Sequence, residues 1–145
     1  MSKYVSGEEN LKHLYDIYEK MAEAVKLEAE KINVPMSFAV TDEYGNLQYF
    51  KRMPGTLSVS TNIAIDKAYT ATGLKMSTAA FAPLVLPSGP LYGIGMHDPK
   101  LITFGGGQIL KKDGVIVGAI GVSGGSVEED DQCGDKAVEV FNELA

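Results

Sequence analysis

Apolar residues recur at steps of three and four near the start of the chain. The stripe consists of Leu11, Leu14, Tyr18, Met21 and Val25, with charged residues at half of the positions between them. This period matches one face of an α-helix. The spacing predicts an amphipathic helix over residues 11–32, and Pro35 prevents it from continuing.

Two short runs rich in apolar and aromatic residues follow, at 36–41 and 47–52. The intervening segment 42–46 contains Gly45, which can adopt the positive φ angle of a tight turn. Strands joined by so short a connection pair in antiparallel fashion. We therefore expect a β-hairpin.

A second helix is predicted over residues 60–76. Ala64, Ala68 and Ala71 lie on one of its faces, and such small side chains allow a helix to approach a sheet closely. Thr78 is expected to cap a short helical turn that ends before Pro83.

Residues 83–100 combine many prolines and glycines with apolar residues. Structureless loops longer than about 12–15 residues are uncommon and are often functional. An apolar loop of this kind must cover the core, a ligand or a neighbouring subunit. We favour the core or a subunit over a ligand.

Three further strands are predicted at 101–104, 108–111 and 115–123, followed by a helix over 127–144. Hairpin-linked strands with helices before, between and after them are typical of an α+β domain. The expected architecture is a single domain over residues 1–145. Its antiparallel sheet has about five strands, with the helices packed on it.

Composition narrows the functional classes. The chain has 145 residues and a net charge of −6, from 13 basic and 19 acidic residues. An acidic chain is a poor partner for nucleic acid or for an anionic membrane surface. The single cysteine excludes an internal disulfide framework.

Residues 1–10 contain no apolar signal-peptide core, and the uncharged segment 76–97 is broken by prolines. We therefore expect a soluble cytoplasmic protein.

Two motifs have simple structural interpretations. The segment 121–125 matches G-x-S-x-G, but a hydrolase of that type needs a histidine after the serine, and both histidines precede it. We interpret it as a tight turn from strand to helix. The acidic run 128–131 follows Ser126, which forms a capping-box pattern with Glu129, so a solvated helix start is expected. Cys133 is interpreted as a packing residue.

Four side chains and one glycine cluster remain as candidates for chemistry. His13 and His97 are each more typical of a surface or hydrogen-bonded histidine than of a metal ligand, although one histidine is sufficient to ligate haem iron. Lys67 and Arg52 can pair with acids or meet ligand carboxylates, and pairing is the more common role. At Gly105–Gly107 the backbone can approach a flat ligand or another chain.

Several segments together resemble the GlcG/HbpS family, which includes the C-terminal domain of PduO-type proteins. They are RMPG at 52–55, AIDKAYTA at 64–71, PLYGI at 90–94, FGGG at 104–107 and DGVIVGAIGVSGG at 113–125. The resemblance implies a profilin-like α+β fold and a homo-oligomer. It also implies that some relatives bind haem and that others are encoded with glycolate, diol or glycerol catabolism. It supplies no established catalytic mechanism. Pro54 replaces an acidic residue that is frequent in the family.

The favoured hypothesis is a cytoplasmic oligomer that holds haem or another flat cofactor in an apolar cleft. The first helix, the loop 83–100 and the glycine strand with Gly105 and Gly106 are expected to line it. His13 is the first candidate for the axial ligand and His97 the second, while Lys67 or Arg52 would meet the propionates.

Two alternatives remain open. One is an enzyme or accessory factor that acts on a small hydroxy acid or aldehyde, centred on Lys67 and Arg52 with Thr70 or Ser123. The other is a structural oligomer without a ligand. Binding is preferred to catalysis because the sequence shows no acid–base or nucleophile–base pair at a useful spacing.

Overall fold

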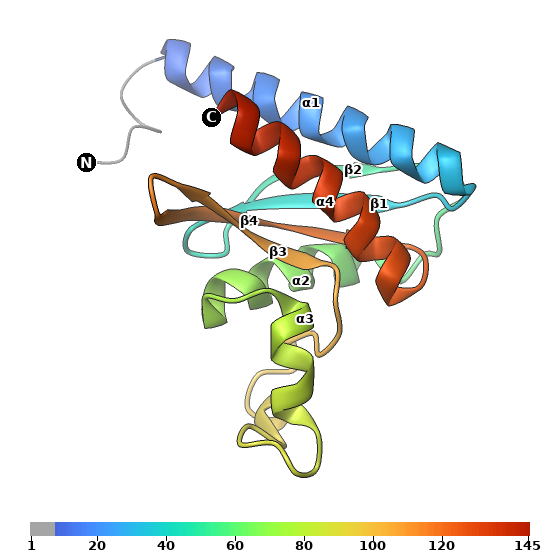
Figure 1. Cartoon of the computed structure of the whole chain (residues 1–145), viewed down its shortest axis with the longest axis vertical. Helices are drawn as coiled ribbons and strands as arrows, with labels where there is room; N and C mark the ends of the chain where they lie inside the picture. Colours follow the sequence, from blue (N-terminus) through green and yellow to red (C-terminus); the bar gives the residue numbers. More distant parts are fainter. Residues whose placement is uncertain (1–7) are drawn as a thin grey trace.

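The computed structural model describes residues 8–145 of the chain (Figure 1). The α-helices are α1 (Glu8–Ile32), α2 (Ser60–Leu74), α3 (Thr78–Phe81) and α4 (Val127–Leu144). The strands are β1 (Ser37–Asp42), β2 (Leu47–Arg52), β3 (Gly107–Lys112) and β4 (Val115–Ser123). Two short 3₁₀ turns, η2 (Ala82–Val85) and η3 (Ile94–Met96), lie between α3 and β3.

The strands form one antiparallel sheet in the order β2-β1-β4-β3. Helices α1 and α4 cover one face, and α2 lies on the other (Figure 1). The expected hairpin, the last helix and the α+β, profilin-like class are confirmed. The described part of the sheet has four strands rather than about five.

The missing strand is the one predicted at 101–104. There the chain runs beside α2 instead of pairing with a strand, because the Ile102 amide donates to Thr70 Oγ1 at 2.9 Å. A second correction concerns the cap of α3. The N-cap is Ser77, whose Oγ accepts from the Ala80 amide. Thr78 is buried instead, and its hydroxyl accepts from the Gly107 amide at 2.8 Å.

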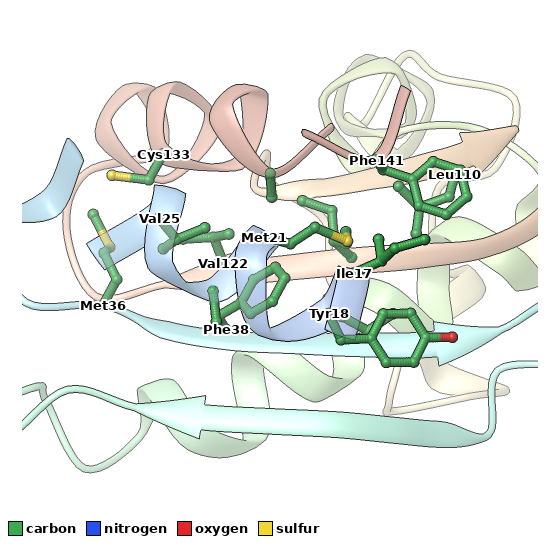
Figure 2. Packing of buried hydrophobic residues seen from close by; sticks show 14 of the residues in the cluster. Ile17, Tyr18, Met21, Val25, Met36, Phe38, Leu110, Val122, Cys133 and Phe141 are labelled. Carbon is green, nitrogen blue, oxygen red and sulfur yellow. The ribbon is translucent and has the colours of Figure 1, made fainter. Parts of the chain in front are cut away.

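The main core lies between the sheet and the pair α1 and α4 (Figure 2). Residues alternate along each strand, so Phe38 and Val40 of β1 and Ile120 and Val122 of β4 point to this face. The predicted stripe of α1 from Leu14 to Val25 and the buried residues of α4, including Cys133, complete it, while the Leu11 side chain lies outside the part that the structure describes. The packing role expected for Cys133 is confirmed.

The opposite face is built from small residues. Ala119 and Gly121 of β4 lie beneath the alanines of α2. A Cβ atom added to Gly121 would lie only 1.8 Å from the Ala64 carbonyl oxygen. The backbones of α2 and β4 are therefore in direct contact, as the alanine face of the helix predicts.

The segment from α3 to Phe104 projects away from the sheet on the side of α2 (Figure 1). Phe81 at its base is fully buried, whereas Leu86, Tyr92 and Met96 are exposed, Met96 by 89%. Within residues 8–145, no helix has both the length and the apolar character that a membrane crossing requires.

Replacement of Gly121 by alanine should lower the free energy of unfolding by about 3 kcal/mol, the upper end of the usual cost of overpacking. Gly73→Ala is the matched control, because a Cβ at this α2 position meets nothing within 4 Å. That substitution should stabilise the protein by about 0.5–1 kcal/mol. Urea denaturation measures both changes, and a Gly121→Ala protein with wild-type stability would contradict the backbone contact.

Candidate functional site

The six residues predicted to bind a cofactor lie in four places. His13 is exposed on α1, and His97 is exposed on the projecting segment. Arg52 ends β2, while Lys67 of α2 lies close to the pair Gly105–Gly106. The expected cleft is not formed within one chain, because α1 and the segment 83–100 lie on opposite faces of the sheet (Figure 1).

Lys67 forms a buried ion pair with Asp130. Its Nζ lies 2.7 Å from Asp130 Oδ2 in the first turn of α4 and 2.8 Å from the Val122 carbonyl oxygen. The Asp130 Oδ1 accepts from the Gly125 amide at 2.9 Å. Lys67 is fully buried and Asp130 is 3% exposed. The sequence predicted a solvated helix start for the acidic run 128–131. This prediction is wrong for Asp130, because its carboxylate turns inward to meet the lysine.

The glycine cluster is explained by these charges. A Cβ at Gly106 would lie 2.4 Å from Lys67 Nζ, and a Cβ at Gly105 would lie 2.5 Å from Asp131 Oδ2. The Phe104 ring covers the site, with its centroid 5.1 Å from Lys67 Nζ. The close approach predicted at Gly105–Gly107 is therefore an approach to side chains of the same molecule.

Burial dominates the electrostatics of this cluster. Loss of solvation raises the pKa of the Asp130 carboxyl and lowers the pKa of the Lys67 ammonium, while their mutual attraction opposes both shifts. The pKa of Asp131 is also raised by burial, against a hydrogen bond from the Gly106 amide. With both Nζ contacts internal, Lys67 serves the fold in this arrangement and is not presented to a small molecule.

A groove of about 470 Å³ lies between α1 and the end of the β1–β2 hairpin. We call it the α1–β2 groove. Its lining residues are Ala22, Glu23, Val25, Lys26, Glu30, Met36, Phe38, Lys51, Arg52, Met53 and Pro54. The volume falls within the range of small-ligand pockets, about 300–1,000 Å³. Arg52 is the sequence-predicted residue that lines it.

The strand register decides which basic side chain of β2 faces the groove. Lys51 pairs with Phe38, which belongs to the core on the α1 side, whereas Arg52 pairs with Ser37. The Ser37 hydroxyl lies 2.8 Å from that of Ser60 at the start of α2, so this position faces the other side. The Arg52 guanidinium donates to the Thr56 carbonyl oxygen. Lys51 is therefore better placed than Arg52 to meet an anion in the groove.

The groove combines an apolar floor with charged edges. Met53 and Pro54 supply accessible apolar surface, whereas Met36 and Phe38 are only 1% and 2% exposed. Lys26 and Lys51 share the edges with Glu23 and Glu30. Lys51 also lies 3.6 Å from Glu19, in an exposed ion pair that another anion can displace.

Sequence reasoning missed the floor of the groove and the role of Asp130. The groove could have been predicted from the RMPG segment at 52–55, because this segment places the cation of Arg52 and the thioether of Met53 next to a turn. Within the described residues, no cluster of three or more histidine, cysteine, aspartate or glutamate side chains is arranged to hold a metal ion. Burial raises the pKa of the Cys133 thiol to about 12, which leaves it protonated and unreactive at neutral pH.

Comparison with known proteins shows a family that the chain matches over most of its length. The family model described as haem degrading protein HbpS-like matches residues 15–139. A 15.0 kDa protein in the dhaT–dhaS intergenic region of Citrobacter freundii is 40% identical over 126 residues, 86% of this chain and 89% of the relative.

A longer relative and a solved structure add to this comparison. The corrinoid adenosyltransferase PduO of Salmonella typhimurium is 36% identical over 88% of this chain, which spans only 38% of that protein. The crystal structure titled PduOC:Heme complex matches with a TM-score of 0.85 and 35% identity. That match covers 88% of this chain and 94% of the other.

Substitution of Asp130 by asparagine should lower the free energy of unfolding by about 3–5 kcal/mol, because it leaves the buried Lys67 ammonium without its counter-charge. The double variant Lys67→Met/Asp130→Leu should recover most of this loss, since apolar side chains of similar size replace a buried pair at little cost. Urea denaturation measures both.

The matched control is Lys136→Met on the surface of α4. It breaks an exposed ion pair with Glu139 and should cost less than about 1 kcal/mol. If Asp130→Asn were tolerated as well as this control, the Lys67–Asp130 pair would not be a determinant of stability.

Proposed function

The chain belongs to the family of haem-degrading, HbpS-like proteins, and from that membership we propose that it binds haem or a related tetrapyrrole in the α1–β2 groove. The proposal includes a cytoplasmic homo-oligomer that assists diol, glycerol or glycolate catabolism. It treats the chain as a binding protein rather than an enzyme.

The observation that carries the proposal is the chemistry of the groove. Haem is a flat apolar ring with two carboxylates on one edge. Met53 and Pro54 offer apolar surface to the ring, and the ammonium groups of Lys26 and Lys51 offer positive charge to the carboxylates, beside Glu23 and Glu30. These are the residues that would hold this group in our proposal. When bound, haem would supply iron, and the chain would supply apolar cover and charge complementarity.

The comparisons support the same ligand class. One structural relative is a haem complex by its title, and the PduO relative is a corrinoid adenosyltransferase by name. Haem and corrinoids share a flat tetrapyrrole ring. PduO also supports the assignment to diol catabolism that the sequence resemblance implies.

His13 and His97 are the proposed axial ligands that the sequence supplied. Both are exposed, and neither is among the described residues that line the groove. Each imidazole would therefore ligate iron only if haem bound at that histidine's own position, His13 on α1 or His97 on the projecting segment, rather than in the α1–β2 groove. We assign Lys67, Gly105 and Gly106 to the support of the fold, because their contacts are internal.

Lys51→Met should weaken haemin binding about fivefold, because an exposed charge pair contributes up to about 1 kcal/mol. The same variant should also bind protoporphyrin IX more weakly. It should bind protoporphyrin IX dimethyl ester as the wild type does, since the ester has no carboxylate for the lysine to meet. Absorbance titration measures each affinity. Lys111→Met, at an exposed position on the opposite edge strand β3, is the matched control. Equal losses in the two variants would contradict the proposed position of the propionates.

Native mass spectrometry of the purified protein should show a multiple of the 15.5 kDa chain mass. The physical reason is the exposed apolar surface of the projecting segment, at Leu86, Tyr92 and Met96, which a neighbouring subunit would cover. Met96→Glu should shift the population toward monomer. A monomeric wild-type protein at micromolar concentration would contradict the proposed assembly.

A further inference from the structure

Both hairpin turns of the sheet lie at the same end of the molecule (Figure 1). Asp42 at the end of β1 pairs with Gly118 of β4, so the β1–β2 turn at 43–46 lies beside the β3–β4 turn at 113–114. Helix α2 also ends here, with Lys75 as its C-cap. A second groove, of about 510 Å³, lies between these three segments, and we call it the turn groove. Its lining includes Glu43, Tyr44, Thr72, Lys75, Val115 and Ile116.

The β1–β2 turn holds Tyr44 in a fixed and exposed position. Asp42 Oδ1 accepts from the amides of Tyr44 and Asn46, each at 2.9 Å, and Asp42 Oδ2 accepts from the Asn46 side-chain amide at 3.1 Å. A Cβ added to Gly45 would lie 3.1 Å from the Tyr69 ring, so the turn is packed against α2. Tyr44 is nevertheless 80% exposed. A tyrosine on an ordered turn is typical of an interface anchor, because it supplies a large contact area at little cost in entropy.

The same surface carries a hollow and two opposite charges. Val115 is 64% exposed and Ile116 is half-buried, so the groove offers apolar surface beside the tyrosine. Within residues 8–145, neither Glu43 nor Lys75 forms an ion pair. A projecting ring, an apolar hollow, an acid and a base thus lie together on one surface. A two-fold contact between identical chains requires this kind of self-complementary surface.

We propose that the turn groove is a two-fold contact between two copies of this chain, an inference that rests on the homo-oligomer of the proposed function. Tyr44 of each copy fills the groove of the other, and Glu43 of each copy pairs with Lys75 of the other. The two-fold axis makes each contact twice. A second copy fits better than an unrelated protein, because this chain itself supplies both the ring and the hollow, and both charges. The contact is separate from the projecting segment, so the two surfaces together link chains into an assembly larger than a dimer.

The first test isolates this contact in the Met96→Glu variant, in which the projecting segment carries a charge in place of an apolar side chain. Native mass spectrometry of this variant should show a dimer. Adding Tyr44→Ser should raise the dissociation constant of that dimer at least about thirtyfold, the effect of losing one interface anchor. Tyr15→Ser is the matched control, because it removes a half-exposed tyrosine of α1 that belongs to neither surface, and it should leave the dimer intact.

The second test exchanges the charges in the same background. Glu43→Lys and Lys75→Glu each place like charges at both contacts, so each variant alone should be monomeric. An equimolar mixture of the two should regain a dimer, because each contact then joins opposite charges. Labelling one variant with ¹⁵N identifies the mixed dimer by its mass. Lys111→Glu, at an exposed position of β3, is the matched control and should leave the dimer intact.

The outcomes separate this inference from the proposed function. If Met96→Glu alone is already monomeric, if Tyr44→Ser acts no more strongly than Tyr15→Ser, or if the mixed charge variants stay apart, the two-fold contact is wrong. The assembly proposed through the projecting segment survives each of these results. If the wild-type protein itself is monomeric at micromolar concentration, the proposed assembly fails together with this contact.

Discussion

The buried ion pair between Lys67 and Asp130 is the interaction on which the rest of the structure depends. It joins α2 on one face of the sheet to α4 on the other, past the end of β4, where the Val122 carbonyl oxygen takes part. Charges removed from water require complete sets of partners. The chain meets that requirement with the Gly125 amide and with glycines at 105 and 106, where any side chain would collide with the charged groups. The same requirement keeps Gly106 close to Lys67 of α2.

The sheet separates the groove in which we propose binding from this cluster. The α1–β2 groove draws its surface from α1 and from residues that alternate toward that face of the hairpin, Phe38 and Lys51 among them. Two of the segments that carry the family resemblance, at 64–71 and 104–107, therefore supply the buried ion pair and its cover. The segment 52–55 supplies the groove. Family likeness in this chain therefore falls on the buried ion pair in one place and on the α1–β2 groove in another.

Periodicity and turn chemistry were sufficient to predict the helices, the hairpin, the last strand and the α+β class, because these follow from local patterns of burial. The strand expected at 101–104 is absent because a tertiary contact, from Ile102 to Thr70, competes with strand pairing. The inward turn of Asp130 was hidden because a capping box looks the same in sequence whether its next residue is solvated or paired. The cleft predicted between the first helix, the segment 83–100 and the glycine strand does not form within one chain, because the order of the layers depends on long-range packing. For the same reason the α1–β2 groove was not predicted.

The contact between α2 and β4 has a consequence for redesign. Where Gly121 lies against the Ala64 carbonyl, a larger residue would have to displace main chain, so that layer tolerates almost no change in composition. The face beneath α1 is filled by long, adaptable side chains, Met21, Met36 and Met53 among them, and these can adopt new rotamers around a different shape. New molecular preferences can therefore be engineered on one side of the sheet while the rigid side is left intact.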